Sequence, residues 1–197
     1  MKDRSPTIIL CRHGETEWTL SGQHTSITDI PLTRKGQEQA QHLGHLLKNI
    51  ELQAVYTSPL QRARETCELA GFSKKMILEH DAVEWNYGDY EGLTSDAIEV
   101  KHPSWNIFLN GAPGGESPSE AATRADRLIA KLLHHKGNIA LFSHGHFLRL
   151  LAARWIGLDA TAGRLFSLSV ASISILGFER SQRTIKLWNI EHYSVTH

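Results

Sequence analysis

The chain has 197 residues, of which 41% are hydrophobic, and its 21 basic and 21 acidic residues give a formal net charge of zero. A balanced charge provides no electrostatic basis for binding nucleic acid or an anionic membrane, and no apolar run reaches the length of a transmembrane helix. The two cysteines, Cys11 and Cys67, are too few for a disulfide framework, so we expect reduced thiols and a cytoplasmic location.

The first informative stretch is residues 8–16, in which an apolar run leads directly into Arg12, His13 and Gly14. A short apolar run bounded by a turn residue predicts a buried strand, and open α/β sheets bind ligands at the carboxyl ends of their strands. Arginine, imidazole and a glycine that lets backbone N–H groups approach a ligand together favour a phosphate. Imidazole can also carry a phosphoryl group covalently. Taken alone, the tripeptide fits a chance Arg-His pair in a loop equally well.

Residues 17–30 are polar and lack periodicity, so we expect an irregular segment with Trp18 and His24 as its large side chains. A helix should follow Pro31, with Thr33 as its N-cap. Its apolar face is expected to consist of five residues at helical spacing: Ala40, Leu43, Leu46, Leu47 and Ile50.

A second strand is expected at 54–57, followed by a helix with Ser58 as its cap and Pro59 as its first residue. A helix N-terminus presents free N–H groups and the positive end of the dipole, and Arg62 would lie in this first turn. Because Arg64 points about 200° away on a helix, only one of the two arginines can serve a site here. An exposed surface position is the alternative for Arg62.

The most unusual local composition follows a third expected strand at 76–78 and runs from Glu84 to Gly92. Its acidic residues, aromatic residues and glycines fit neither a helical nor a strand period, which indicates a functional loop. On chemistry alone Glu84, Asp89 and Glu91 are all candidates for a proton donor. For Asp89 and Glu91 the alternative role is to stabilise the loop through hydrogen bonds to the backbone.

The second half of the chain contains a short helix at 95–101 and a long one capped by Ser119, whose buried face runs from Ala122 to Leu133. The turn at 113–117 lacks the G-x-x-x-x-G-K-[ST] pattern, so no nucleotide site is expected there. Residues 173–175 are expected to form an edge-type strand in a hairpin with 184–188.

A second apolar run, at 138–142, ends in Ser143-His144-Gly145-His146, after which a helix is expected to continue to Gly157. Two strands that each end in a histidine and a glycine are hard to explain by packing alone. With both motifs present, the chain resembles the histidine phosphatase superfamily, also called phosphoglycerate mutase-like. The resemblance covers nearly the whole sequence. It implies a single α/β domain over residues 1–197, a three-layer sandwich with a mostly parallel central sheet and helices on both faces.

The resemblance also implies a reaction without metal or cofactor, through a phosphohistidine intermediate on His13. The family carries S-P-x-x-R-A at the position of Arg62, its second phosphate-binding arginine, and takes its proton donor from the loop that begins at Glu84. Neighbouring arginines would disfavour imidazolium and keep His13 neutral for attack. The expected catalytic residues are His13, Glu84, Arg12, Arg62 and His144.

The H-x-H sequence of His144 and His146 also allows a zinc site to be considered. A catalytic zinc site needs a third ligand and an orienting shell, and the covalent mechanism already accounts for His144. The prediction is therefore no metal.

Several loops resemble the sedoheptulose bisphosphatase branch more than the phosphoglycerate mutases. Mutases carry R-H-Y-G where this chain has residues 85–88, and an asparagine where it has Thr19. Arg149, at the end of H-G-H-x-L-R, could hold a second phosphate, or it could be an ordinary helix-surface arginine. By this resemblance Gln23, His24, Tyr87 and Arg149 contact the substrate. The other expected substrate-binding residues are Gly14, Thr19, Trp105 and Gly145.

The function expected from the sequence is hydrolysis of small phosphorylated metabolites, either sugar phosphates or bisphosphates such as sedoheptulose bisphosphate. A phosphoglycerate mutase-type phosphotransferase is one alternative, and a non-catalytic relative that binds phosphorylated ligands is another. All five catalytic residues are present, which favours an enzyme. Its partner would be a small phosphorylated metabolite, without nucleic acid or membrane, and a homo-oligomer is compatible with the sequence.

Overall fold

A six-stranded sheet forms the middle of the protein in the computed structural model, which describes residues 5–191. The strand order is β3-β2-β4-β1-β5-β6. β1, β2, β3 and β4 run parallel to one another, whereas β5 is antiparallel to both β1 and β6. The strands are β1 (Thr7–Arg12), β2 (Leu52–Thr57), β3 (Met76–Leu78), β4 (Asn138–Ser143), β5 (Ile173–Glu179) and β6 (Gln182–Ile190).

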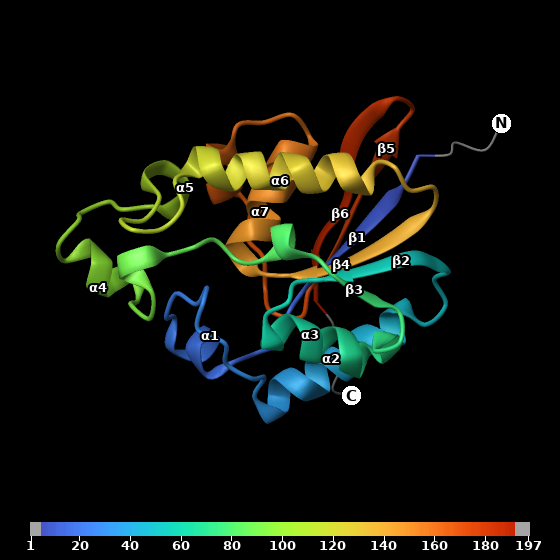
Figure 1. Cartoon of the computed structure of the whole chain (residues 1–197), viewed down its shortest axis with the longest axis horizontal. Coiled ribbons are helices and arrows are strands. Elements are labelled where there is room, and N and C mark those ends of the chain that lie inside the picture. Colours follow the sequence, from blue (N-terminus) through green and yellow to red (C-terminus); the bar gives the residue numbers. More distant parts are fainter. Residues whose placement is uncertain (1–4, 192–197) are drawn as a thin grey trace, which may run out of the picture.

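Helices cover both faces of this sheet (Figure 1). α6 (Pro118–Leu132) and α7 (Gly145–Trp155) lie on one face, and α2 (Arg34–Leu47) and α3 (Gln61–Cys67) lie on the other. The short helices are α1 (Glu17–Ser21), α4 (Ser95–Glu99) and α5 (Ile107–Asn110). The three-layer arrangement with a mostly parallel sheet, expected from the sequence, is confirmed. No helix within residues 5–191 combines the length and apolar composition needed to cross a bilayer.

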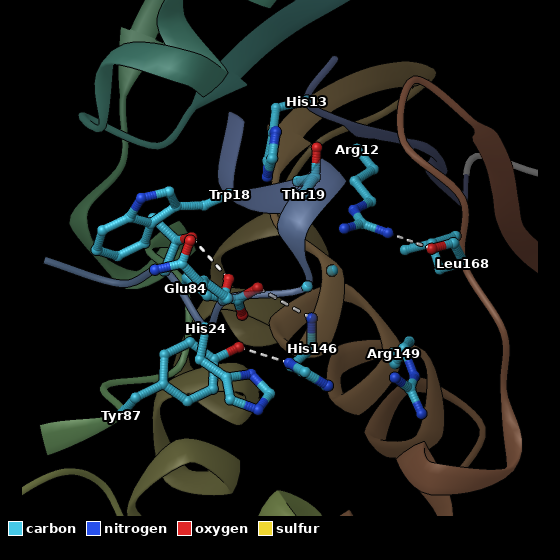
Figure 2. A pocket seen from close by; sticks show the side chains of 14 residues that line it. Arg12, His13, Trp18, Thr19, His24, Glu84, Tyr87, His146, Arg149 and Leu168 are labelled. Carbon is cyan, nitrogen blue, oxygen red and sulfur yellow. Dashed lines mark hydrogen bonds between the residues drawn. The ribbon is translucent and has the colours of Figure 1, made fainter. Parts of the chain in front are cut away.

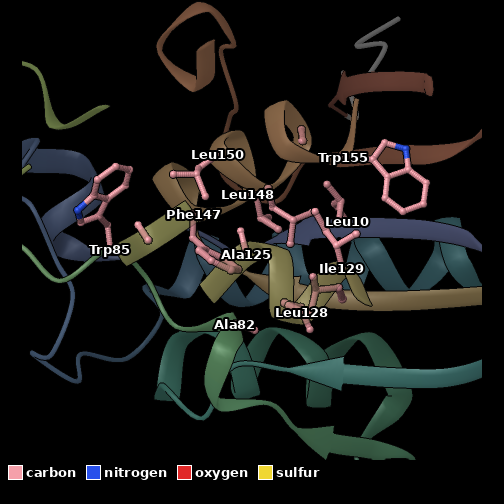
Figure 3. Close-up of a cluster of buried hydrophobic side chains, with 14 of the residues drawn as sticks. Leu10, Ala82, Trp85, Ala125, Leu128, Ile129, Phe147, Leu148, Leu150 and Trp155 are labelled. Atoms are coloured by element: carbon pink, nitrogen blue, oxygen red, sulfur yellow. The ribbon is translucent and has the colours of Figure 1, made fainter. Parts of the chain in front are cut away.

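The central strands are apolar on both faces because each face meets a layer of helices. Ile8 and Leu10 of β1 belong to the core beneath α6 and α7. Figure 3 shows Leu10 in this core together with Trp155. Their neighbours Ile9 and Cys11 point to the opposite core, beneath α2 and α3. Because alternate side chains of β1 are buried on opposite faces, the orientation of the strand is fixed up to Arg12 and His13.

Local sequence signals account for several helix starts, with some corrections. Thr33 caps α2 as expected and accepts a hydrogen bond from the Gly36 N–H at 3.0 Å. Leu46 is 41% exposed, because Leu43 and Leu47, four residues apart, occupy the side of α2 that faces the sheet. Ser119 is not the cap of α6; Ser117 takes that position and forms a capping box with Glu120.

Three further expectations change with tertiary context. α3 begins at Gln61 rather than at Pro59, because Leu60 is still extended. The segment expected to be irregular contains α1, whose N-cap Thr16 and third residue Thr19 hydrogen-bond reciprocally. β5 is an interior strand, paired on both sides, and β6 is the edge strand.

Candidate active site

Two histidines distant in sequence meet at the carboxyl ends of two central strands, β1 and β4. β1 and β4 are adjacent and parallel, with Arg12 opposite Ser143, so the residues that follow both strands emerge side by side. The rings of His13 and His144 are therefore 5.2 Å apart between centroids. Both side chains are buried, with exposed fractions of 4% and 0%.

The ring of His13 is held in one orientation by its own chain. Its Nδ1 lies 2.8 Å from the carbonyl oxygen of Gly14. Because a carbonyl only accepts, we assign the proton to Nδ1, which leaves the lone pair on Nε2. Burial lowers the pKa of His13 well below its ordinary value, and the charges of Arg62 and Arg12 lower it further. His13 is thus a neutral imidazole with a lone pair on Nε2.

The ring of His144 is oriented by Ser58. Its Nε2 lies 2.8 Å from Ser58 Oγ, and this hydroxyl oxygen accepts the Leu60 N–H at 3.3 Å. A Ser58 hydroxyl that donates to Nε2 leaves the proton of His144 on Nδ1. Burial, followed by the charge of Arg62, lowers the pKa of His144 well below its ordinary value.

Two buried arginines lie against the histidine pair. Arg62 is 1% exposed and donates to the carbonyl oxygens of Thr25, Ser26 and Thr28 at 3.0–3.3 Å. Arg12 donates to the carbonyl oxygen of Leu168. Burial lowers the pKa of both guanidinium groups, and the nearby Glu84 opposes this shift.

Three buried nitrogens in this cluster have no hydrogen-bond partner within residues 5–191. They are Nε of Arg12, Nε of Arg62 and Nδ1 of His144. All three belong to residues whose charges act on His13 or whose ring contacts it. The cluster therefore has spare donor capacity that suits an anionic acceptor.

Of the three acids in the 84–92 loop, only Glu84 lines the cleft in front of His13. Its carboxylate accepts the N–H groups of Trp85 and Phe147 at 2.8 Å and of His146 at 3.1 Å, which fixes it at the N-terminus of α7. Asp89 is exposed at the surface. Both carboxylate oxygens of Glu91 are engaged by the 25–28 loop.

The cleft has a volume of about 200 Å³ and brings together most of the residues singled out in the sequence (Figure 2). From the expected set it contains Arg12, His13, Thr19, Gln23, His24, Glu84, Tyr87, Gly145 and Arg149. Arg62 and His144 lie behind its wall, in contact with the residues that line it. Five further residues line the cleft without an expected binding role: Trp18, Gly22, Thr25, His146 and Leu168. The H-x-H sequence marks His146 as a candidate site residue, although on its own it suggests a metal ligand rather than a residue that lines a substrate cleft.

The structure places two expected binding residues away from the cleft. The N–H of Gly14 donates to Thr66 Oγ1 at 3.1 Å, and a Cβ at Gly14 would lie 2.5 Å from the Gly36 carbonyl oxygen. Gly14 therefore permits close packing of the chain after β1 against α2, and its N–H is already occupied. Trp105 lines a neighbouring pocket and meets the cleft only indirectly, through an edge contact with the ring of His24 at 5.3 Å.

Gly145 leaves room at the cleft for the side chain of Arg12. It is the first residue of α7, and a Cβ there would approach Cζ of Arg12 to 3.1 Å. A methyl group at this position would require the guanidinium of Arg12 to shift by a few tenths of an ångström. Glycine at 145 thus allows the start of α7 and the end of β1 to share one wall of the cleft.

The family model for the histidine phosphatase superfamily (branch 1) matches residues 8–191. The chain belongs to this superfamily. It is similar to an acid phosphatase of Mycobacterium tuberculosis, with 39% identity over 92% of this chain and 91% of that protein. It is also similar to sedoheptulose 1,7-bisphosphatase of Saccharomyces cerevisiae, with 36% identity over 80% of this chain and 70% of that protein.

A solved structure of an open reading frame product of Mycobacterium tuberculosis has a closely similar fold, with a TM-score of 0.88 and 36% identity. The match covers 93% of this histidine phosphatase and 97% of that chain. The phosphoglycerate mutase-like fold expected from the sequence is therefore confirmed. The superfamily and its phosphatase relatives identify the protein as a phosphoric monoester hydrolase of the histidine phosphatase type.

Proposed function

We propose that this histidine phosphatase hydrolyses small phosphorylated sugars, bisphosphates in preference to monophosphates, through a phosphohistidine on His13. The observation that carries the proposal is the neutral His13, with its Nε2 lone pair, in a cleft beside Arg12 and backed by Arg62. A neutral imidazole is nucleophilic, and the surrounding cations can balance the charge of a phosphate monoester.

In the first step the Nε2 lone pair attacks phosphorus and forms the N–P bond. The bond between phosphorus and the sugar oxygen breaks, and its electron pair stays on that oxygen, which takes a proton from the Glu84 carboxylic acid. Arg12 holds the nonbridging oxygens from the cleft wall, and the Nε of Arg62 and Nδ1 of His144, unpaired in the described part of the chain, are the donors that support it from behind. Positioning and charge stabilisation of this kind are most of what phosphoryl transfer requires.

In the second step water attacks the phosphorus of phosphohistidine while the Glu84 carboxylate accepts a proton from that water. The N–P bond breaks, its electron pair returns to Nε2, and inorganic phosphate leaves. The three backbone N–H groups that hold Glu84 keep its carboxyl group at the same place for both steps. Every role is filled by the chain itself, so the proposed reaction needs no cofactor.

The preference for bisphosphates rests on Arg149, at the far side of the cleft. Its guanidinium lies over the Phe108 ring at 4.7 Å and donates to the carbonyl oxygen of Gly163 at 3.2 Å. These contacts hold a half-buried cation at the cleft wall rather than a mobile side chain on the helix surface. The phosphate at His13 already has Arg12 and Arg62, so Arg149 is available for a second anionic group.

Two further observations support the proposal. The relatives named as an acid phosphatase and a sedoheptulose 1,7-bisphosphatase cover most of the chain. Cys11 and Cys67 are free and buried, which suits a metabolic enzyme of the reducing cytoplasm.

The test measures inorganic phosphate released from a panel of sugar bisphosphates, sugar monophosphates and phosphoglycerates. We expect sugar bisphosphates to give the highest kcat/KM, and substrate labelled with ³²P to leave an acid-labile, alkali-stable label on the wild type but none on His13→Ala. In Arg149→Met the preference for a bisphosphate over its monophosphate should fall about 10- to 100-fold, as for a hydrogen bond to a charged group. A His13→Ala variant with near-wild-type turnover would refute the nucleophile. Isomerisation of a phosphoglycerate without phosphate release would identify a mutase instead.

A further inference from the structure

Among the rings in the cleft to which the proposed reaction gives no role, His146 is the one that lies beside Arg149 (Figure 2). His146 lines the cleft two residues after His144 and three before Arg149. Figure 2 shows its imidazole between Tyr87 on one side and Arg149 on the other. A carbon chain that joins one phosphate at His13 to another at Arg149 would lie in the cleft that this ring lines.

The ring of His146 is fixed by its neighbours. Its Nδ1 forms a 2.5 Å hydrogen bond with the Tyr87 hydroxyl. The rings of Phe108, His24 and Tyr87 surround it, with centroids at 5.4, 5.7 and 5.8 Å. The contact with Glu84 comes from the backbone N–H of His146, so it does not depend on the side chain.

The other ring nitrogen, Nε2, is available for a ligand. Within the part of the chain that the structure describes, Nδ1 is the only ring nitrogen of His146 that forms a hydrogen bond. The side chain is only partly buried, and the accessible part faces the cleft.

The pair of His146 and Tyr87 is uncharged. Burial lowers the pKa of His146 well below its ordinary value, and the charge of Arg149 adds to this shift. Burial also raises the pKa of the Tyr87 phenol, and the charge of Glu84 raises it further. When the phenol donates to Nδ1, Nε2 carries a proton and donates; when Nδ1 donates to the phenol oxygen, Nε2 accepts. A hydroxyl group, itself both a donor and an acceptor, matches either state.

We infer that His146 is a specificity residue, whose Nε2 binds a hydroxyl group on the carbon chain of the substrate. The inference rests on the proposed sugar phosphate activity and assigns its recognition of hydroxyls to this ring. It gives the second histidine of the H-x-H pair a role distinct from that of His144: His144 serves the phosphate, and His146 serves the sugar.

Two substitutions separate the two nitrogens of the ring. The amide of His146→Asn reaches about as far as Nδ1 and can keep the bond to Tyr87, whereas that of His146→Gln reaches about as far as Nε2. Two six-carbon probes report on the hydroxyls: fructose 1,6-bisphosphate carries them, and 1,6-hexanediol bisphosphate does not. His134→Asn makes the same exchange at an exposed histidine just beyond α6 and serves as the control.

We expect His146→Asn to lower kcat/KM about tenfold more on fructose 1,6-bisphosphate than on 1,6-hexanediol bisphosphate, the size of one lost hydrogen bond. His146→Gln should recover most of this difference, and His134→Asn should behave as the wild type. Equal losses on both probes in His146→Asn, or a larger loss in His146→Gln than in His146→Asn, would show a structural role and overturn the inference while the proposed function stands. A wild type that cleaves both probes equally well would refute sugar recognition itself, and with it both proposals.

Discussion

The carboxylate of Glu91 offers a sharp test of how the active site is held together. Its oxygens accept three different donors from the 25–28 loop: the Ser26 N–H at 2.9 Å, the Thr28 N–H at 3.0 Å and the Ser26 hydroxyl at 2.5 Å. The carbonyl oxygens of Thr25, Ser26 and Thr28 in turn hold the guanidinium of Arg62. Glu91→Ala therefore removes the anchor of the loop that positions Arg62.

The size of the effect follows from the number of donors. Three hydrogen bonds at a net value of about 1 kcal/mol each predict a loss of about 3 kcal/mol in the free energy of unfolding. In a domain of this size that loss corresponds to a decrease in Tm of about 6–12 °C. In the proposed reaction Arg62 helps to position the phosphate, so its displacement should also lower kcat/KM roughly tenfold or more when measured well below Tm.

The contribution of Glu91 to stability should depend on pH. Burial alone would raise the pKa of Glu91, but the hydrogen bonds from Ser26 and Thr28 outweigh it and lower the pKa below 4.5. The stability that Glu91 contributes is thus fully present above pH 4.5 and is lost as pH falls through the lowered pKa. The difference in Tm between the wild type and Glu91→Ala should therefore narrow as pH falls below 4.5.

Calorimetry across this pH range and steady-state kinetics on an aryl phosphate measure both effects. The control, Glu99→Ala, removes an exposed carboxylate near the end of α4 and should change neither quantity. A Glu91→Ala protein with wild-type Tm and kcat/KM would refute the reasoning, as would a difference in Tm that is independent of pH.

Three further predictions concern the chemistry. Gly145→Ala should lower kcat/KM several-fold with little change in Tm, because its Cβ would lie 3.1 Å from Cζ of Arg12 and shift the guanidinium; a fully active variant would show that the position of Arg12 is not critical. Glu84→Gln should slow phosphoenzyme formation from sugar phosphates by about 100-fold, yet hardly from nitrophenyl phosphate, whose leaving group needs no proton. If Glu84→Gln slowed phosphoenzyme formation equally from both substrates, another residue would be the proton donor. Prolonged dialysis against EDTA should leave kcat unchanged; loss of activity that zinc or magnesium restores would replace the metal-free mechanism.

The sequence predicted the fold well because its signals are local and mutually consistent. The apolar runs of β1 and β4 each end in a polar residue and a glycine, so both strands and their ligand-binding ends could be read directly. Their adjacency could not be derived from the runs themselves, since nothing local specifies which strands pair. The resemblance to a family supplied that step. Position 119 shows the limit of local signals, since Ser117 and Ser119 are both plausible caps and only the reciprocal contact with Glu120 selects Ser117.

The active site was predicted less evenly, because one residue type can serve several roles. Ser58 reads locally as a helix cap, but in the fold its hydroxyl contacts His144. Gly14 is expected from the sequence to let a ligand approach the backbone, but in the structure its missing side chain allows α2 to pack closely. Trp105 packs behind His24 rather than lining the cleft. In each case the partner comes from a segment far away in the chain, which no local pattern identifies.

The central place of β1 in the sheet has a consequence for how the protein is made. β1 is hydrogen-bonded on one side to β4 and on the other to β5, both of which leave the ribosome long after it. At ordinary elongation rates the wait is on the order of ten seconds. During that time Ile8, Ile9 and Leu10 form an apolar segment with neither neighbour present. We therefore expect the nascent chain to depend on chaperones until β4 emerges, and the two histidines to meet only late in synthesis.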